Sequence, residues 1–318
     1  MPLLSIIALC YNHEQFLDAA LDSLSGLPDW VEVLVADDAS TDSSAGLLQN
    51  WQQKQPSWTF VFNKVNQGNC KTFNHLLSKA SGDWILDFAT DDVLLPHQLT
   101  DWIRTAQRHP ECGFCYADAE IFYQDDGPKR LHSALYPVQH FPEGMILPRL
   151  FGAHFICPPA VLFSKKAIDH VRGYNEALSY EDLDIWIRIA RHFPVYRHPE
   201  PVIAYRKHPD SMSASISRNR NRKHLQSTIT ILKYSNDWKE LQTGNHHLVA
   251  FIRYHLRLSF YLQLPEEAKI LYQILHQKTA AGLQERLFCT FSSLLPGLTI
   301  LYHSLKTRRD KKKFFQNG

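Results

Sequence analysis

Residues 84–92 have the sequence WILDFATDD, an apolar run that ends in two adjacent aspartates. Such a run is typical of a strand that is buried on both faces of a parallel sheet. Comparable apolar runs lie before and after it, at residues 3–10, 31–36, 59–62 and 113–122. Segments with apolar residues at helical spacing alternate with these strands, at residues 14–25, 43–53, 71–80 and 96–108. This alternation predicts an α/β fold with a Rossmann-like, mostly parallel sheet that is flanked by helices.

The rest of the chain changes character near residue 212. Residues 158–206 contain further strand patterns and one helical pattern, EDLDIWIRIARHF. After that point strand signals are few, and helical periodicity appears at residues 222–236, 246–262, 266–276 and 282–303. We therefore predict an α/β domain over residues 1–212 and a C-terminal helical region with a basic tail over residues 213–318.

The composition excludes several classes of protein. The chain has 318 residues, of which 44% are hydrophobic, so it can form a large core and is not intrinsically disordered. The formal net charge of +2 argues against a nucleic-acid-binding protein. The six cysteines have no framework spacing, and the single C-x-x-C pair, Cys112 and Cys115, lies in an apolar strand pattern without a second pair to complete a zinc site. We expect packing thiols there.

The sequences at the two ends of the chain indicate where in the cell the protein is expected. The N-terminal sequence MPLLSIIALCYNHE has no basic n-region, so we expect no signal peptide and a cytoplasmic protein. No stretch reaches the roughly 18 apolar residues of a spanning helix. The nearest, residues 287–303, is interrupted by Ser, Pro and Gly, and basic residues follow it between residues 306 and 313. An apolar helix beside a basic cluster suits an anionic membrane surface, and a core helix with a solvated tail is the alternative.

Two pairs of aspartates follow predicted strands. Asp37 and Asp38 follow the second strand, and Asp91 and Asp92 follow the fourth. Ligands of open parallel sheets bind at the carboxyl ends of the strands, where both pairs are expected to lie. Neighbouring carboxylates repel one another, and a divalent cation such as Mg²⁺ or Mn²⁺ removes that cost. The alternative is that each pair only forms turns and caps helices.

Other nucleotide-binding motifs are absent, and a third acidic cluster is present. No G-x-G-x-x-G follows the first strand, and residues 68–72 lack a glycine of the phosphate-binding loop. The third cluster is SYEDLDIW at residues 179–186. Acidic residues at a helix start also favour the helix dipole, which is the structural explanation for this cluster.

Residues 4–208 resemble the family 2 glycosyltransferases, which have the GT-A fold. The matching runs are SIIALCYNHEQFLDAALDSL (5–24), VEVLVADDASTDSS (31–44), NQGNCKTFNHLLSKASGDWILDFATDDVLLP (66–96), GYNEALSYEDLDIWIRIA (173–190) and YRKHPDSMS (205–213). They occur in the family's order and spacing. The resemblance does not cover the C-terminal third of the chain.

The resemblance implies a role for each matched position. Asp38 falls where the family contacts the nucleotide base, and the backbone of Ala8, Cys10, Tyr11 and Asn12 lines the same pocket. Asp91 and Asp92 fall on the metal motif, with Asp92 as the stronger candidate ligand of Mn²⁺ or Mg²⁺. Asp182 falls on the catalytic base of inverting members, and Glu181 lies beside it. Arg206 and His208 match a loop that folds over the donor diphosphate, and His208 is a further candidate metal ligand.

Two positions depart from the family pattern. The first position of the metal motif is Thr90 in place of an aspartate, so Asp92 is the main expected ligand. Phe73 stands where many members have an arginine before Asn74, and Lys71 is the candidate for supplying that charge.

The implied activity is inverting, metal-dependent transfer of a sugar from a nucleotide-sugar, expected to be a UDP-sugar. The expected acceptor is a hydroxyl of a glycan or lipid-linked saccharide, in the synthesis of a polysaccharide such as lipopolysaccharide or capsule. Because the expected acceptor is lipid-linked, we also expect the protein to attach peripherally to the inner face of the plasma membrane. His154, Phe155 and Pro158 are candidates to line the acceptor site, with apolar core as the alternative. A sugar-nucleotide nucleotidyltransferase and a non-catalytic GT-A-fold binding protein are the competing hypotheses.

Overall fold

The structure is a computed structural model that describes residues 2–123, 127–136, 140–152, 155–209, 211, 222–242, 245–280 and 282–291. The chain divides into two compact units. The first comprises Met1–Glu176 and Tyr180–Ser211, and the second comprises Ala177–Ser179 and Met212–Gly318. Every strand that the structure describes belongs to the first unit.

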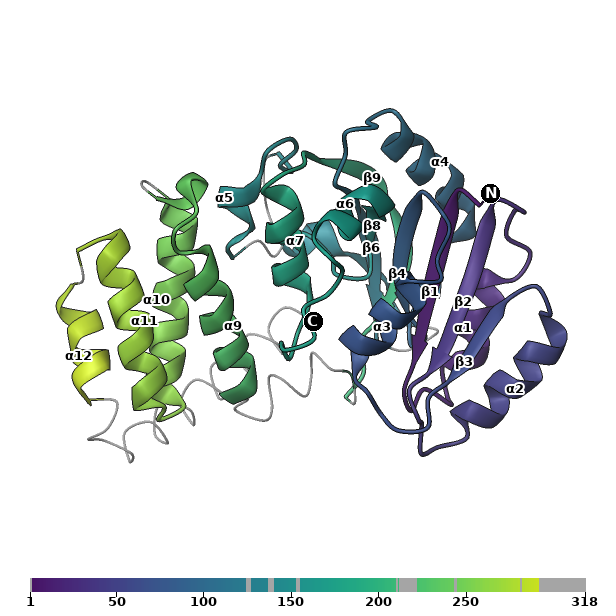
Figure 1. Ribbon diagram of the computed structural model, residues 1–318, viewed down its shortest axis with the longest axis horizontal. Coiled ribbons are helices and arrows are strands. Elements are labelled where there is room, and N and C mark those ends of the chain that lie inside the picture. Colours follow the sequence, from purple (N-terminus) through teal and green to yellow (C-terminus); the bar gives the residue numbers. More distant parts are fainter. Residues whose placement is uncertain are drawn as a thin grey trace. The chain divides into compact units, whose positions relative to one another are not determined.

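The described strands form one mixed sheet in the order β3-β2-β1-β4-β8-β6-β9-β5, with β7 paired to β6. Their bounds are β1 Leu4–Cys10, β2 Val31–Asp37, β3 Thr59–Phe62, β4 Trp84–Ala89, β5 Val93–Leu94, β6 Phe114–Phe122, β7 Arg130–Leu131, β8 Val161–Ser164 and β9 Val195–Arg206. Strands β3, β2, β1 and β4 are parallel neighbours, as the alternating pattern predicted. Figure 1 shows β1, β2 and β4 side by side.

The rest of the sheet mixes the parallel pair of β6 and β9 with antiparallel pairs. β8 lies between β4 and β6 and is antiparallel to both, so β6 runs parallel to β4 without touching it. The pairs of β5 with β9 and β7 with β6 are also antiparallel. The sequence pattern predicted β6 at residues 113–122 and further strands within residues 158–206, but it did not predict that β8 runs antiparallel to its neighbours. The predicted fold class, a GT-A type sheet flanked by helices with a helical C-terminal region, is confirmed.

Helices connect and flank these strands. They are α1 Leu17–Leu24, α2 Ser44–Lys54, α3 Asn69–Leu77, α4 Pro96–Gln107, α5 Leu147–Leu150, α6 Lys165–His170 and α7 Asp182–Ala190, with a short 3-10 turn at His132–Leu135. Pro96 occupies the first turn of α4, where its missing N–H costs no hydrogen bond. At the start of α2, Oδ1 of Asp42 accepts a hydrogen bond of 2.9 Å from the N–H of Ser44, which caps the helix.

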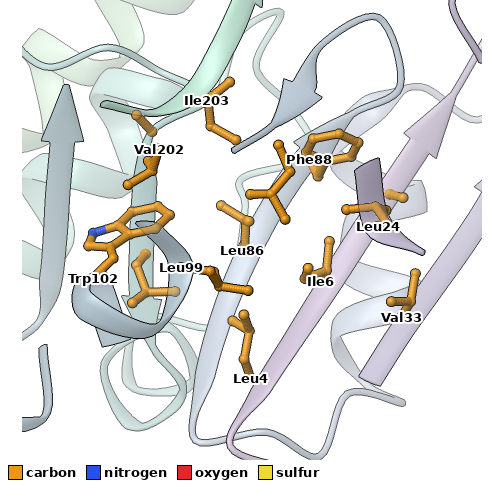
Figure 2. Packing of buried hydrophobic residues seen from close by; sticks show 14 of the residues in the cluster. Leu4, Ile6, Leu24, Val33, Leu86, Phe88, Leu99, Trp102, Val202 and Ile203 are labelled. Atoms are coloured by element: carbon orange, nitrogen blue, oxygen red, sulfur yellow. The ribbon is translucent and has the colours of Figure 1, made fainter. Parts of the chain in front are cut away.

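One face of the sheet forms the main core. Successive side chains of a strand point to opposite faces, so Leu86 and Phe88 of β4 share a face with Leu4 and Ile6 of β1. Figure 2 shows these side chains in one layer with Leu99 and Trp102 of α4. Asp87, between Leu86 and Phe88, therefore points away from this core.

The second unit contains the predicted C-terminal helices. They are α9 Arg222–Ser235, α10 His246–Tyr261, α11 Pro265–Lys278 and α12 Leu283–Phe291, with a 3-10 turn at Lys239–Leu241. The turn predicted at Leu264 lies between α10 and α11. Among the residues that the structure describes, no helix is long and apolar enough to cross a membrane. Most of the apolar stretch 287–303 and all of the basic cluster lie outside the described residues, so membrane contact stays a prediction.

The cysteines are packing residues, as expected. All six are free thiols, and Cys112 and Cys115 are buried. Burial raises the pKa of Cys112 to about 12 and raises that of Cys115 as well, so both stay protonated and unreactive at neutral pH.

Candidate active site

The parallel register brings the first acidic pair and the metal motif to one edge of the sheet. Cys10 at the end of β1 pairs with Asp37, and Leu9 pairs with Ala89 of β4. The backbone continues this pairing beyond the strands, because the N–H of Asp38 donates to the carbonyl of Cys10 at 2.9 Å. On the other side, the N–H of Thr90 donates to the carbonyl of Leu9 at 3.1 Å.

The segment after β1 turns sharply at this edge. Asn12 has a positive φ of 58°, a conformation that asparagine adopts more readily than most residues. Its Oδ1 accepts a hydrogen bond of 2.8 Å from the N–H of Thr41. Tyr11 presents a 44% exposed side chain beside this turn. Ala8 and Cys10 have buried side chains, and the structure does not bring Ala8 to the strand ends, because it pairs within β1 with both neighbouring strands.

The first aspartate pair organises a loop. Oδ1 of Asp38 accepts hydrogen bonds from Nδ2 of Asn63 at 2.8 Å and from the N–H of Gln67 at 2.9 Å. Its Oδ2 accepts one from the N–H of Gly68 at 2.8 Å. Oδ2 of Asp37 accepts one from the N–H of Ser40 at 3.1 Å. This pair therefore contributes turn and loop chemistry, which the sequence had offered as the alternative to a shared cation.

The second aspartate pair meets the end of β9. Oδ1 of Asp92 accepts a hydrogen bond of 2.8 Å from the N–H of Arg206, and Nε of Arg206 donates to the carbonyl of Asp91 at 2.9 Å. Nε2 of His208 lies 3.0 Å from Oδ2 of Asp91. The Arg206 guanidinium lies 4.9 Å from the ring centre of Phe16, where it makes a cation–π contact. The structure thus brings all four predicted residues of this group together.

The charges of this pair favour a cation. Burial raises the pKa of Asp92 well above its usual value, and the negative charge of Asp91 raises it further. Burial also opposes ionisation of Asp91, but the hydrogen bond to His208 and the charge of His13 lower its pKa on balance. A divalent cation between these side chains would relieve the repulsion.

The carboxylates fit a metal ion whose coordination shell is completed by the substrate. Among the described residues, no three His, Cys, Asp or Glu side chains gather closely enough to hold a metal alone. Mg²⁺ commonly takes one or two carboxylates and completes its shell with water and substrate phosphates, so Asp92 with Asp91 suffices for such a site. Thr90 is no ligand, because its buried hydroxyl donates to the carbonyl of Leu9 at 3.0 Å.

A second carboxyl cluster lies at the start of α7. Burial raises the pKa of Asp182, the first residue of this helix, to about 6, although a hydrogen bond from Glu181 lowers it. Burial and the charge of Asp182 raise the pKa of Glu181 well above its usual value. At neutral pH, which is above the pKa of Asp182, this residue is the ionised member of the pair. Asp182 is thus prepared to accept a further proton.

The charges of the site carboxylates act on the pKa values of two buried cysteines. Burial raises the pKa of Cys157, and the charges of Asp92 and Asp182 both raise it further. Burial raises the pKa of Cys70 to about 12, and the charges of Glu181, Asp87 and Asp182 add to this. Cys70 lies in the first turn of α3, directly after the loop that Asp38 holds. The charge of Asp182 raises the pKa of both thiols.

Some expected residues do not join this region. Lys71 is exposed on α3, and none of the contacts described for this chain joins it to a site carboxylate. Phe155 is buried and lies 5.8 Å from the ring of Tyr116, so it belongs to the core. Pro158 is exposed, and His154 lies outside the described residues. Sequence reasoning missed Asp87, whose signal was a charged residue in the middle of an apolar strand.

A comparison with protein-family models matches residues 5–172 to the model described as Glycosyl transferase family 2, which is more than half of the chain. The chain belongs to glycosyl transferase family 2. For this family 2 glycosyltransferase, the matched part holds Asp38, Asp91 and Asp92. Asp182 and Arg206 lie beyond it, so their roles rest on the resemblance and on the geometry described above.

Relatives and solved structures agree with this family. A Campylobacter jejuni protein named GalNAc(5)-diNAcBac-PP-undecaprenol beta-1,3-glucosyltransferase is 22% identical over 281 residues, 86% of this chain and 87% of that protein. The chain spans only 59% of the length of the first curated relatives, uncharacterised proteins of Mycobacterium bovis and Mycobacterium tuberculosis that are 26% identical over 220 residues, or 64% of this chain.

Two solved structures share the fold. S. aureus TarS in complex with UDP-GlcNAc has a TM-score of 0.66 at 16% identity, over 92% of this chain and 87% of that chain. The mannosyltransferase PcManGT from Pyrobaculum calidifontis, in complex with GDP-Man and Mn²⁺, has a TM-score of 0.56 at 14% identity, over 98% of this chain and 88% of that chain. At these identities the likeness shows the fold alone.

Proposed function

We propose that this glycosyltransferase moves a sugar, with inversion, from a UDP-sugar to a hydroxyl of a glycan or lipid-linked saccharide. The observation that carries the proposal is that Asp91, Asp92, Arg206 and His208 meet at one edge of the sheet. This group is suited to hold a diphosphate, and Asp182, at the start of α7, is suited to accept a proton. Transfer of a sugar between oxygens requires this combination.

The donor would bind along the strand ends. The loop that Asp38 orders, together with the backbone from Cys10 to Asn12, would contact the base and ribose. Asp92 and Asp91 would hold Mn²⁺ or Mg²⁺ together with the donor phosphates, and His208 would hold the Asp91 carboxylate in place. The cation neutralises charge on the leaving diphosphate when it is bound. The guanidinium of Arg206 supplies a fixed positive charge on the same side, where negative charge develops during transfer.

Asp182 would act as the general base. An alcohol is a weak nucleophile, so a carboxylate must take its proton as the new bond to the anomeric carbon forms. The proton moves from the acceptor hydroxyl to Asp182, and the bond to the diphosphate oxygen breaks. Attack from the face opposite the leaving group inverts the anomeric configuration. Glu181 keeps its own proton and orients the Asp182 carboxylate through their hydrogen bond.

Two features of the relatives support this proposal. The Campylobacter relative is named for transfer of glucose to an undecaprenol-linked saccharide, and TarS was solved with UDP-GlcNAc. Family membership leaves the nucleotidyltransferase hypothesis without support. The non-catalytic binding protein remains an outcome of the test.

The test is slow hydrolysis of a panel of donors with Mn²⁺: UDP-glucose, UDP-GlcNAc and GDP-mannose. We expect turnover of a UDP-sugar and a loss of about three or more decades in rate in Asp182→Asn, with donor affinity retained. Asp101→Asn, at an exposed position of α4, is the matched control. No turnover of any donor would favour the non-catalytic binding protein. Preference for GDP-mannose would show that the donor nucleotide is GDP instead of UDP. Full activity of Asp182→Asn would exclude Asp182 as the general base.

A further inference from the structure

Asp87 is a carboxyl without a role in the mechanism above. It lies in the middle of β4, between Leu86 and Phe88, which belong to the core cluster. Since side chains alternate along a strand, Asp87 points to the opposite face, where it is partly exposed. A charged residue inside an apolar strand weakens the strand pattern and needs a polar partner there.

Tyr174 is the partner of Asp87. Its hydroxyl donates a hydrogen bond of 2.7 Å to Oδ2 of Asp87. The Asn74 side chain holds the backbone of Tyr174 at both polar atoms, accepting from its N–H at 2.9 Å and donating to its carbonyl at 2.9 Å. The ring of Tyr174 lies 4.2 Å from that of Phe73. Tyr174 is therefore fixed at its backbone, its ring and its hydroxyl.

The same segment is tied to the helix that carries Asp182. Nη1 of Arg188, on α7, donates to the carbonyl of Val171 at 2.6 Å, and Nη2 donates to that of Gly173 at 2.8 Å. Nε of Arg188 also donates to Oδ2 of Asp184 at 2.8 Å. Strand β4 is thus joined through Asp87 and Tyr174 to the segment that Arg188 fastens to α7.

The charges around Asp87 couple it to the predicted base. The Tyr174 hydroxyl contacts Asp87 directly, and the charge of Asp87 raises the pKa values of Glu181 and Cys70. Burial raises the pKa of Asp87 to about 7, the Tyr174 hydrogen bond lowers it, and the charge of Asp182 raises it. Between about pH 6 and pH 7, Asp182 is ionised while Asp87 keeps its proton.

We propose that Asp87 is a positioning residue for the transfer reaction, which fixes α7 through Tyr174 and offsets the charge change at Asp182. This inference rests on the proposed function. When Asp182 takes the acceptor's proton, its negative charge disappears. Without that charge nearby the pKa of Asp87 falls, so Asp87 releases its own proton to water. One proton enters the carboxyl cluster and one leaves, so the cluster keeps its charge while the diphosphate departs.

The test compares pH profiles of kcat for donor hydrolysis, using the UDP-sugar that the panel identifies. Asp87→Asn can still accept the Tyr174 hydrogen bond but cannot ionise. We expect kcat of the wild type to rise through the ionisation of Asp182 near pH 6 and to fall through that of Asp87 near pH 7, and Asp87→Asn to lose the fall. Its kcat should be about tenfold below wild type at pH 6.5 and close to wild type at pH 8.5, where wild-type Asp87 has no proton left to release, with an unchanged donor KM. Asp83→Asn, the same substitution at an exposed position four residues earlier, should keep the wild-type profile.

Tyr174→Phe separates the positioning effect of the Tyr174 hydrogen bond from the effect of the Asp87 charge. It removes the hydrogen bond and keeps the ring, so kcat should fall at every pH while the upper ionisation moves to higher pH. A wild-type profile in Asp87→Asn, or an equal loss at every pH, would overturn the inference. If Asp182→Asn is inactive in the same experiment, the proposed function still stands. If Asp182→Asn is fully active, the proposed base is wrong and the inference falls with it.

Urea unfolding gives a readout that needs no activity. The folded state holds the Asp87 proton up to about pH 7, whereas the unfolded chain releases it near pH 4, so this group lowers stability as the pH rises through that window. The unfolding midpoint of the wild type should therefore fall relative to that of Asp87→Asn between pH 4 and pH 8. A constant difference would show that Asp87 does not titrate there and would overturn the inference.

Discussion

The backbone N–H of Arg206 donates a hydrogen bond of 2.8 Å to Oδ1 of Asp92. This bond joins the last residue of β9 to a residue that follows β4, although the two are 114 positions apart in the sequence. It uses one carboxylate oxygen of Asp92, and no hydrogen bond described for the chain engages Oδ2. The second oxygen is therefore the one suited to a cation.

Asp92→Asn should separate these two functions of the side chain. The amide oxygen can still accept the Arg206 hydrogen bond, but the charge that a cation requires is lost. We expect the gain in donor affinity that Mn²⁺ provides to fall at least about tenfold. Calorimetry of UDP binding with and without Mn²⁺ measures this, with Asp101→Asn as the control. An unchanged Mn²⁺ effect would show that Asp92 is not a ligand.

The rate should depend on the ionisation of Asp182. Burial raises the pKa of this carboxyl to about 6, and only the ionised form can accept a proton. Below about pH 6, kcat for donor hydrolysis should fall about tenfold for each pH unit, because the ionised fraction falls by that factor. Circular dichroism at each pH shows whether the fold persists. A rate that is constant down to pH 5 would contradict this assignment.

Asp38→Ala should disturb the loop that precedes α3. The substitution removes an acceptor from the N–H groups of Gln67 and Gly68 and from the amide of Asn63. Gly68 and Asn63 keep one other acceptor each, Asn66 and Thr72. We expect a loss of about 1–3 kcal/mol in the free energy of unfolding, together with weaker UDP binding. Urea denaturation and calorimetry measure the two effects. Asp29→Ala, at an exposed position, should change neither.

Gly82 and Gly46 offer a matched pair of substitutions in the first unit. A Cβ on Gly82 would lie 2.6 Å from the backbone nitrogen of Ser5 and 2.7 Å from the carbonyl carbon of Leu4, so β1 would have to move. Gly82→Ala should lower the free energy of unfolding by about 1–3 kcal/mol. Gly46 lies within α2 with nothing within 4 Å of its added Cβ, so Gly46→Ala should raise stability by about 1 kcal/mol. Equal urea midpoints for the two variants would contradict this account of Gly82.

The sequence predicted the framework because it is encoded locally. The apolar runs before Cys10, Asp37 and Ala89 predicted parallel neighbours, and the family motifs predicted which strand ends carry acidic residues. The helix that begins at Asp182 was expected from its acidic start and apolar spacing. The direction of β8 had no such local signal, because antiparallel insertion depends on the path of the preceding loop.

By itself, the sequence determined the fold class, the family and the acidic residues at the strand ends, because hydrophobic periodicity and motif spacing are properties of neighbouring residues. Only the tertiary structure decided which oxygens are already engaged. It assigned the Asp38 carboxylate to a loop, left Lys71 apart from the acidic groups, and placed Asp87 beside Tyr174 and Asp182. The reason is that proton affinities and hydrogen-bond partners depend on distances between side chains that are far apart in the chain.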